Sequence, residues 1–339
     1  MRKLLNTLYV TLPDAYLSKD GETVLVRQEH ETRLRVPILA LEGIVCVGQV
    51  SMSPALMAFC AERNVGVSFL GEYGRFLARI QGPIHGNVLL RREQYRRADS
   101  EADSVPIARS VLLAKVANGR TALLRAAREH PSEALDRAVT AMGGSLRALE
   151  STGTLDGLRG VEGDAAHGYF SVFDELILQQ KEAFFFHERS RRPPLDNVNS
   201  LLSFLYVLLA HDVASALEVV GLDPGVGFLH RDRPGRASLA LDLMEELRPV
   251  LADRLALTLI NRRQVTPSGF IRSDSGAVTM NDATRKEVLV AWQSRKQEEI
   301  LHPFLNERIP IGLVPYAQAL LLARHLRGDL DAYPSFFWR

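Results

Sequence analysis

A histidine and three carboxylates lie close together in the stretch GFLHRDRPGRASLALDLMEELRP. His230 follows an apolar run, and Asp242, Glu245 and Glu246 lie in a segment of helical composition for which Ser238 is the expected N-cap. Asp242 and Glu245 are three positions apart, so a helix places them on one face. Repulsion among such carboxylates costs a few tenths of a kcal/mol per pair, and a bound cation removes that cost. An imidazole with carboxylate oxygens suits Mn²⁺ and tolerates Mg²⁺.

The same stretch also fits a simpler interpretation, in which the glutamates are solvated and pair with Arg248 or nearby arginines. A metal site needs a further ligand, and Glu162 in LRGVEGDAAHGYFSVFDELIL is a candidate. Small neighbours would let this carboxylate approach another backbone. A first-turn glutamate favoured by the helix dipole explains it equally well. Spacing alone leaves both interpretations open.

Other chemistry is excluded by missing motifs. The chain has no phosphate-binding loop with Gly-Lys-Ser/Thr, no Gly-x-Gly-x-x-Gly, no Gly-x-Ser-x-Gly and no His-Glu-x-x-His. Cys46 and Cys60 are the only cysteines, which argues against a disulfide framework or a thiolate zinc site. No apolar run approaches roughly 18 residues and no signal peptide is evident, so we expect a cytoplasmic protein without a membrane segment.

The first part of the chain has the pattern of a β-rich domain. Asp20-Gly21 predicts a hairpin turn, and GEYGR predicts another turn. A short helix should begin after Ser53, with Pro54 at its first position. Strands are expected at 23–27, 33–37, 43–47, 65–70 and 76–80.

Beyond Gly86 the apolar spacing becomes helical, and the polar stretch DSEADS near residue 100 predicts a linker. A chain of 339 residues usually forms two domains. We therefore predict an α+β protein, with a small N-terminal β-rich domain over 1–95 and a larger all-α-helical catalytic domain over 96–339.

The net charge of +1 conceals clusters of arginine, at 91–97, 189–192, 231–236 and 262–263. Guanidinium groups match phosphate geometry, so clustered arginine is typical of polyanion-binding surfaces. A single cluster also fits a solvated face with ion pairs. Several clusters in one chain favour nucleic acid. Tyr169 and Trp292 are expected in the core rather than as base-stacking platforms.

Two further stretches carry a resemblance. GVEGDAAHGYF, and PLDNVNSLLSFLYVLLAHDVASALEVVGLDPGVGFLHRDRPGRASLALDLMEELRPVLADRLALTLINR, resemble the core of the CRISPR-associated Cas-one family. The likeness extends over nearly the whole chain, including VTPSGFIRSDSGAVTMNDATRKEVLVAW. It implies Mg²⁺ or Mn²⁺ ligands at Glu162, His230 and Glu245, with Asp242 supporting the site or replacing Glu245. Relatives often have Asp at the position of Glu245.

The resemblance also implies a function. Such a protein is a metal-dependent DNA integrase and endonuclease of CRISPR adaptation, which joins prespacer 3′-hydroxyl ends to the CRISPR array by transesterification. It implies a homodimer formed through the β-rich domains, the Cas-two protein as partner, and double-stranded DNA (prespacer and CRISPR repeat) as substrate. Eight basic residues are then expected to bind DNA: Arg231, Arg233, Arg236, Arg262, Arg263, Arg272, Arg285 and Lys286. The alternatives are an architectural DNA-binding protein without catalytic metal and an unrelated small-molecule metallohydrolase, against which the arginine distribution speaks.

Overall fold

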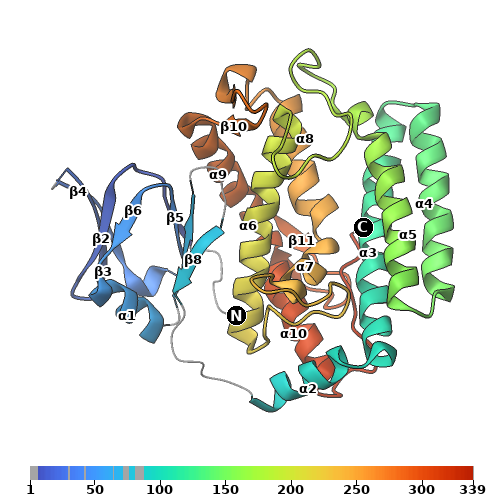
Figure 1. The fold of residues 1–339 in the computed structure, drawn as a ribbon, viewed down its shortest axis with the longest axis horizontal. Coiled ribbons are helices and arrows are strands. Elements are labelled where there is room, and N and C mark those ends of the chain that lie inside the picture. Colours follow the sequence, from blue (N-terminus) through green and yellow to red (C-terminus); the bar gives the residue numbers. More distant parts are fainter. Residues whose placement is uncertain are drawn as a thin grey trace. The chain divides into compact units, whose positions relative to one another are not determined.

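The computed structural model describes residues 7–29, 31–41, 43–63, 65–71, 76–80 and 88–338. The chain divides into two compact units. The first contains Met1–Gly86 together with Asp282–Gln297, and the second contains Asn87–Asn281 together with Glu298–Arg339. The first unit is rich in strands and the second is mainly helical (Figure 1), as expected for the predicted α+β class. The predicted GEYGR turn lies outside the described residues except for Gly71.

The first unit contains two four-stranded sheets, in the orders β4-β3-β2-β6 and β1-β5-β7-β8. Their strands are β1 (Thr7–Val10), β2 (Ala15–Asp20), β3 (Thr23–Gln28), β4 (Glu31–Pro37), β5 (Gly43–Val47), β6 (Val50–Met52), β7 (Gly66–Leu70) and β8 (Phe76–Ile80). The Asp20-Gly21 hairpin is confirmed, because Asp20 pairs with Thr23 and Gly21 has the positive φ of +57° that such a turn requires.

Alternate side chains of these strands form one apolar core. Val24 and Val26 of β3 belong to it, as do Ile44 and Cys46 of β5. The intervening Leu25 and Val45 are buried too, so both faces of these strands are covered there. Helix α1 (Pro54–Glu62) packs on this core, and its Ser53 hydroxyl accepts a hydrogen bond from Leu56 N as predicted. Helix α9 (Asp282–Gln297) also belongs to this unit, and its Trp292 is fully buried as expected.

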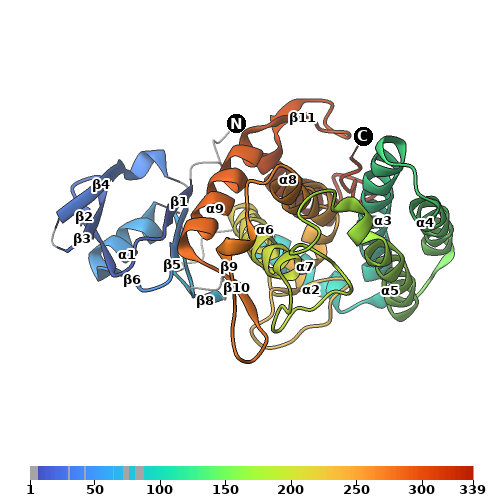
Figure 2. The ribbon, with the colours of Figure 1, turned by 90° about the horizontal axis from the view of Figure 1, so that it is seen from above.

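The helical unit begins with α2 (Val88–Ala98) and α3 (Glu101–Glu129). The predicted linker at DSEADS is wrong, because Ser100 caps α3 by accepting a hydrogen bond from Asp103 N. Serine followed by acidic residues stabilises a helix N-terminus as readily as it fills a linker. Helices α3, α4 (Glu133–Ser151) and α5 (Leu155–Ser171) lie side by side (Figures 1 and 2).

Helix α6 (Asn197–Val220) is the core helix of this unit, between a cap at Asp196 and Gly221, whose φ is +93°. It is long and apolar enough to cross a membrane by length and composition. However, it packs against α7 (Ser238–Glu245) and α10 (Val314–Leu326), and more than half of its most apolar window is buried. This packing is typical of a core helix in a globular domain.

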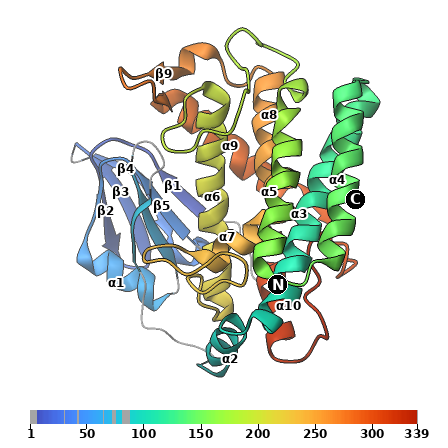
Figure 3. The same ribbon diagram turned by 45° about the vertical axis from the view of Figure 1, so that its right-hand side comes forward.

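After α7 the chain continues through a π-helical segment (Arg248–Asp253) into α8 (Arg254–Asn261). Figure 3 shows α7 beside α6, with α8 above it. Ser238 is the first helical residue rather than the predicted N-cap, and its hydroxyl donates to the Arg231 carbonyl. Two antiparallel pairs complete the unit: β9 (Phe270–Arg272) with β10 (Val278–Met280), and β11 (Glu299–Leu301) with β12 (Arg308–Pro310).

The segment after α10 returns to the middle of the helical unit. Phe336 is buried, its carbonyl accepts a hydrogen bond from Asn118 of α3, and Trp338 N donates to the same side chain. The Trp338 ring lies under two guanidinium groups, those of Arg125 at 3.6 Å and Arg254 at 4.2 Å. Cation–π contacts therefore fasten this segment to both α3 and α8.

Candidate functional site

Asp242 is buried and binds the turn that carries His230. Its Oδ2 accepts hydrogen bonds from Phe228 N at 2.6 Å and Leu229 N at 2.9 Å. Its Oδ1 accepts one from His230 N at 2.9 Å and lies 2.6 Å from His230 Nδ1. A carboxylate oxygen accepts, so the 2.6 Å contact places a proton on Nδ1, and in the neutral imidazole this tautomer leaves the lone pair on Nε2. Asp242 thus orients the imidazole in the way that carboxylates orient metal-binding histidines.

Gly227 permits this close approach. A Cβ at position 227 would lie 2.7 Å from Asp242 Oδ2 and 2.9 Å from the Ser238 carbonyl carbon. Both distances are shorter than real contacts, and the second atom belongs to the backbone. Only glycine therefore lets the turn approach α7 closely enough for its amides to bind Asp242.

Arg159 of α5 holds the same turn against the helix that carries Glu162. Its Nε and Nη2 donate to the Leu229 carbonyl at 2.9 Å and 2.5 Å. Asp156, one turn earlier on α5, pairs with both Arg159 and Arg231. The position of His230 is therefore fixed relative to α5 as well as to α7.

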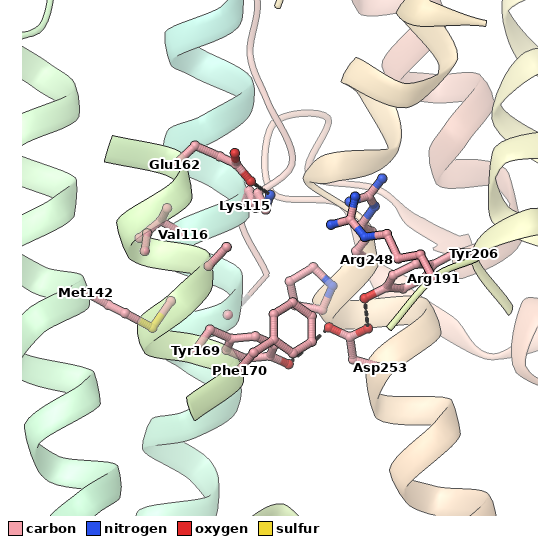
Figure 4. Close-up of a pocket in the computed structure, with 14 residues that line it drawn as sticks. Lys115, Val116, Met142, Glu162, Tyr169, Phe170, Arg191, Tyr206, Arg248 and Asp253 are labelled. Carbon is pink, nitrogen blue, oxygen red and sulfur yellow. Dashed lines mark hydrogen bonds and ion pairs between the residues drawn. The ribbon is translucent and has the colours of Figure 1, made fainter. Parts of the chain in front are cut away.

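Glu162 and Glu245 come from different helices and face one cation. The Lys115 ammonium of α3 pairs with Glu162 Oε1 and lies 2.8 Å from Glu245 Oε2. Figure 4 shows the Lys115 and Glu162 side chains pointing toward each other from neighbouring helices. Glu162 lies in the interior of α5, which begins at Leu155, so the alternative of a first-turn glutamate is wrong.

Glu245 is buried in spite of its charge, with 4% of its side chain exposed. The solvated-glutamate interpretation is therefore wrong, although its pairing with Arg248 is confirmed at 2.8 Å. Burial alone would raise the pKa of Glu245, but Arg248 and then Lys115 outweigh it and hold that pKa at about 2. The pKa is lowered further by His230, so the imidazole lies within electrostatic reach of this carboxylate. Glu245 is ionised at neutral pH.

Glu246 serves a different purpose from its neighbour. Its oxygens accept hydrogen bonds from Tyr333 OH at 2.5 Å, Phe336 N at 2.6 Å and the Gln318 amide. It is fully buried, and burial raises its pKa to about 7 in spite of these donors. Adjacent carboxylates at the C-terminal end of α7 therefore point to different partners, Glu245 to Lys115 and Glu246 to the C-terminal segment.

The donor set fits a divalent cation. Two carboxylates already hold a cation between them, and an imidazole with a free Nε2 lies near one of them. Oxygen donors with one imidazole suit Mg²⁺ or Mn²⁺. Within the described ranges, no three histidine, cysteine, aspartate or glutamate side chains are gathered closely enough to hold a metal as they stand. A lysine ammonium is the cation at this position.

A pocket extends from these residues between α3, α5 and the π-helical segment (Figure 4). At its far end Tyr169 and Tyr206 donate hydrogen bonds to Asp253, at 3.1 Å and 2.7 Å. Burial raises the pKa of Asp253 to about 6, against the lowering effect of the two hydroxyls. Tyr169 is buried as expected. Arg191 and Arg248 line the same pocket, so it is both aromatic and cationic.

The predicted DNA-binding residues are spread over the chain. Arg231 and Arg233 are exposed in the turn after His230, and Arg236 is partly exposed there. Arg262 and Arg263 follow α8, and Arg272 lies on β9. Arg285 and Lys286 lie on α9 in the other unit, where Arg285 pairs with Asp282.

Sequence reasoning missed Lys115 and Arg159. Lys115 interrupts an apolar stripe of α3, four positions after Val111 and directly before Val116, both of which are buried. A lysine on a buried helix face needs a carboxylate partner, so its position in this apolar stripe could have indicated that Lys115 lies beside buried acidic residues. Arg159 gives no comparable signal, because it binds a backbone carbonyl whose location depends on the fold.

The fold and the site define a two-unit α+β protein whose helical unit carries a carboxylate and histidine site. The family model for "CRISPR associated protein Cas1" matches residues 8–294. The chain is 52% identical over 343 residues to "CRISPR-associated endonuclease Cas1 1" of Chlorobaculum tepidum, with all of both chains covered. It is 54% identical over 347 residues to "CRISPR-associated endonuclease Cas1 2" of Rhodospirillum rubrum, again with all of both covered. The chain belongs to the Cas1 family.

Solved structures share the fold at lower identity. A casposase bound to integration product superimposes with a TM-score of 0.85 at 20% identity, covering 98% of this chain and 94% of the casposase chain. The Cas6-RT-Cas1–Cas2 complex gives a TM-score of 0.84 at 21% identity, covering 99% of this chain and 36% of that one. At these identities the likeness establishes the fold.

Proposed function

We propose that this protein is a metal-dependent DNA integrase and endonuclease of CRISPR adaptation, which joins prespacer 3′-hydroxyl ends to the CRISPR array by transesterification. The observation that carries the proposal is the pair Glu162 and Glu245, which face one cation, together with His230, which Asp242 orients and which acts electrostatically on Glu245. The names of its relatives agree, since both are called CRISPR-associated endonuclease Cas1.

Glu162, Glu245 and the Nε2 atom of His230 would hold Mg²⁺ or Mn²⁺. Such an ion supplies Lewis-acid chemistry, polarising a phosphoryl oxygen and stabilising the charge that develops during displacement. Asp242 is a positioning residue in this proposal, because the turn amides and His230 Nδ1 already engage both of its oxygens. Glu245 is therefore the third ligand, and Asp242 keeps the imidazole in the tautomer that can bind.

Basic residues of the turn after His230 would bind phosphates on either side of the reacting one. Arg231 and Arg233 are exposed directly beside the proposed ligand, and such contacts position DNA without reading its sequence. We propose the same role for five residues that lie directly after α8, on β9 and on α9: Arg262, Arg263, Arg272, Arg285 and Lys286. Double-stranded DNA, Cas2 and a second copy of this chain are the proposed partners. The first two are supported by the casposase bound to integration product and by the Cas6-RT-Cas1–Cas2 complex, which share the fold.

An architectural DNA-binding protein is the second candidate. It is favoured by one observation, that Lys115 and Arg248 already neutralise the two carboxylates. That candidate gives no reason for burying Asp242 to orient a histidine that is itself partly exposed. The metal-dependent enzyme accounts for both features.

The test is transfer of a labelled duplex into a repeat-containing plasmid, with the Cas2 partner and with Mg²⁺, Mn²⁺ or a chelator. Glu162→Gln and His230→Ala should lower the rate by at least about a hundredfold, because removing a ligand costs more than removing its support. Their DNA affinity should persist. Glu150→Gln is the matched control, since Glu150 is exposed on the neighbouring helix α4. Metal-independent transfer, or full activity in both ligand variants, would refute the proposal.

A further inference from the structure

Lys115 occupies the position between the two proposed ligand carboxylates. It lies in the middle of α3, with 15% of its side chain exposed, and its ammonium contacts both Glu162 and Glu245. These carboxylates come from α5 and α7, so the lysine is the group that holds the two helices' acidic side chains together. Opposite charges at such distances attract strongly where water is largely excluded.

The charges in this cluster already balance. Glu162 and Glu245 carry two negative charges, and Lys115 and Arg248 carry two positive ones. A divalent ion bound by the same carboxylates would add two positive charges to a largely buried site, and the Asp242 carboxylate behind His230 offsets at most one of them. Burying uncompensated charge is costly, so one of the resident cations must withdraw.

Lys115 is the cation that is able to move. Arg248 is as exposed as Lys115, with 16% of its side chain accessible, but its Nη1 is 2.8 Å from Glu245 and its planar guanidinium lies over the Tyr206 ring. Lys115 carries a compact charge on a flexible four-carbon stem. Both side chains line the pocket that continues past Glu162, and the flexible Lys115 stem can turn into it (Figure 4).

We propose that Lys115 is a tethered cation that holds Glu162 and Glu245 together without metal, and that the incoming Mg²⁺ or Mn²⁺ displaces its ammonium from between them. This inference rests on the proposed metal-dependent function. Lys115 is a positioning residue for the metal-free site and a competitor of the metal. Removing the Lys115 charge should leave Glu162 and Glu245 less well positioned in the metal-free protein, and should make the same carboxylates bind the metal more tightly.

Mn²⁺ binding to the chelator-treated full-length protein tests the displacement, followed by electron paramagnetic resonance of free Mn²⁺. Lys115→Met keeps the length of the side chain and removes its charge. It should bind Mn²⁺ about tenfold more tightly than wild type, because two ion pairs no longer have to be broken. Lys115→Arg should bind more weakly than wild type, because a guanidinium can hold both carboxylates with paired donors. Equal or weaker binding in Lys115→Met would overturn the inference.

Two comparisons keep this result separate from that of the proposed function. If wild type binds Mn²⁺, Glu162→Gln does not, and Lys115→Met binds no more tightly than wild type, the tethered-cation inference is refuted and the proposed function stands. No Mn²⁺ binding in any form refutes both. Thermal unfolding checks that the variant folds: Lys115→Met should melt below wild type without metal and gain more from Mn²⁺, and absence of that larger gain counts against displacement.

A measurement on the unaltered protein is independent of folding in the variants. Reductive dimethylation read by mass spectrometry reports how accessible each lysine amine is. Labelling of Lys115 should rise several-fold when Mg²⁺ is added, while the exposed Lys286 of α9 should not change. Unchanged labelling of Lys115 at a Mg²⁺ concentration that saturates binding would overturn the inference.

Discussion

Replacing Asp242 with Asn tests the division of roles between the two acidic residues of α7. The carboxylate accepts hydrogen bonds from Phe228 N and Leu229 N on Oδ2, and engages His230 N and Nδ1 on Oδ1. An amide keeps one acceptor and brings one donor. Whichever way it is turned, at least one buried backbone N–H faces an NH₂ group.

The expected magnitude follows from these contacts. One unsatisfied buried donor, with weakening of the remaining bonds after the charge is lost, should cost about 2 to 4 kcal/mol of unfolding free energy. In a domain of this size, that lowers the melting temperature by roughly 5–12 °C. An amide nitrogen facing Nδ1 also favours the tautomer with the proton on Nε2 of His230, which cannot bind metal. Mn²⁺ affinity should therefore fall by about 10- to 100-fold.

The assay combines thermal unfolding by circular dichroism with Mn²⁺ titration, at neutral pH. Asp232→Asn is the control, since Asp232 is exposed in the same turn. Glu245→Gln should lose more metal affinity than Asp242→Asn, because Glu245 is the proposed ligand. The reasoning fails if Asp242→Asn melts within about 2 °C of wild type and binds Mn²⁺ within about twofold of it.

Two further changes test the surroundings of the site. Gly227→Ala should lower the free energy of unfolding by about 1–3 kcal/mol, because the new Cβ meets Asp242 and the Ser238 backbone. Gly163→Ala, whose Cβ would enter open space, should be neutral or stabilising when both are measured by urea denaturation. Equal losses of stability in the two variants would contradict the packing argument. The raised pKa of Glu246, about 7, lies above the value of about 4.3 in an unfolded chain, so its contribution to stability is complete below that value and is lost as pH rises through 7. Urea unfolding should accordingly show wild type losing about 2 kcal/mol between about pH 5.5 and 8 through this group, and Glu246→Gln losing much less; parallel slopes would show that Glu246 does not carry the effect.

Local signals predicted much of the fold. The Asp20-Gly21 turn and the Ser53 cap depend only on residues next to one another in the sequence, and both predictions were confirmed. The DSEADS stretch failed because the same polar residues serve as a linker or as the capped start of a helix. The choice depends on the apolar residues that follow, of which Val105 and Ile107 are buried in α3.

The candidate site depended on tertiary contacts to a greater degree. Helical spacing places Asp242 and Glu245 on one face, yet nothing local indicates that one binds backbone amides while the other faces Lys115. Neighbouring Glu245 and Glu246 have the same chemistry and differ only in what surrounds them. Burial and partners are properties of the assembled unit, so spacing could not separate these roles.

The segment that ends at Trp338 couples the proposed metal site to the latest-synthesised part of the described chain. Asn118 is joined to residues 336 and 338 across 218 and 220 positions of sequence, and Glu246 to Tyr333 across 87. Contacts of such long range form slowly, because a large loop must close before they are made. Until they form, the carboxylate of Glu246, which caps the C-terminal end of α7 directly beside Glu245, lacks these donors. A nascent chain that has not yet reached Trp338 therefore lacks the support behind its acidic helix, which delays completion of the site until nearly the whole described chain has been made.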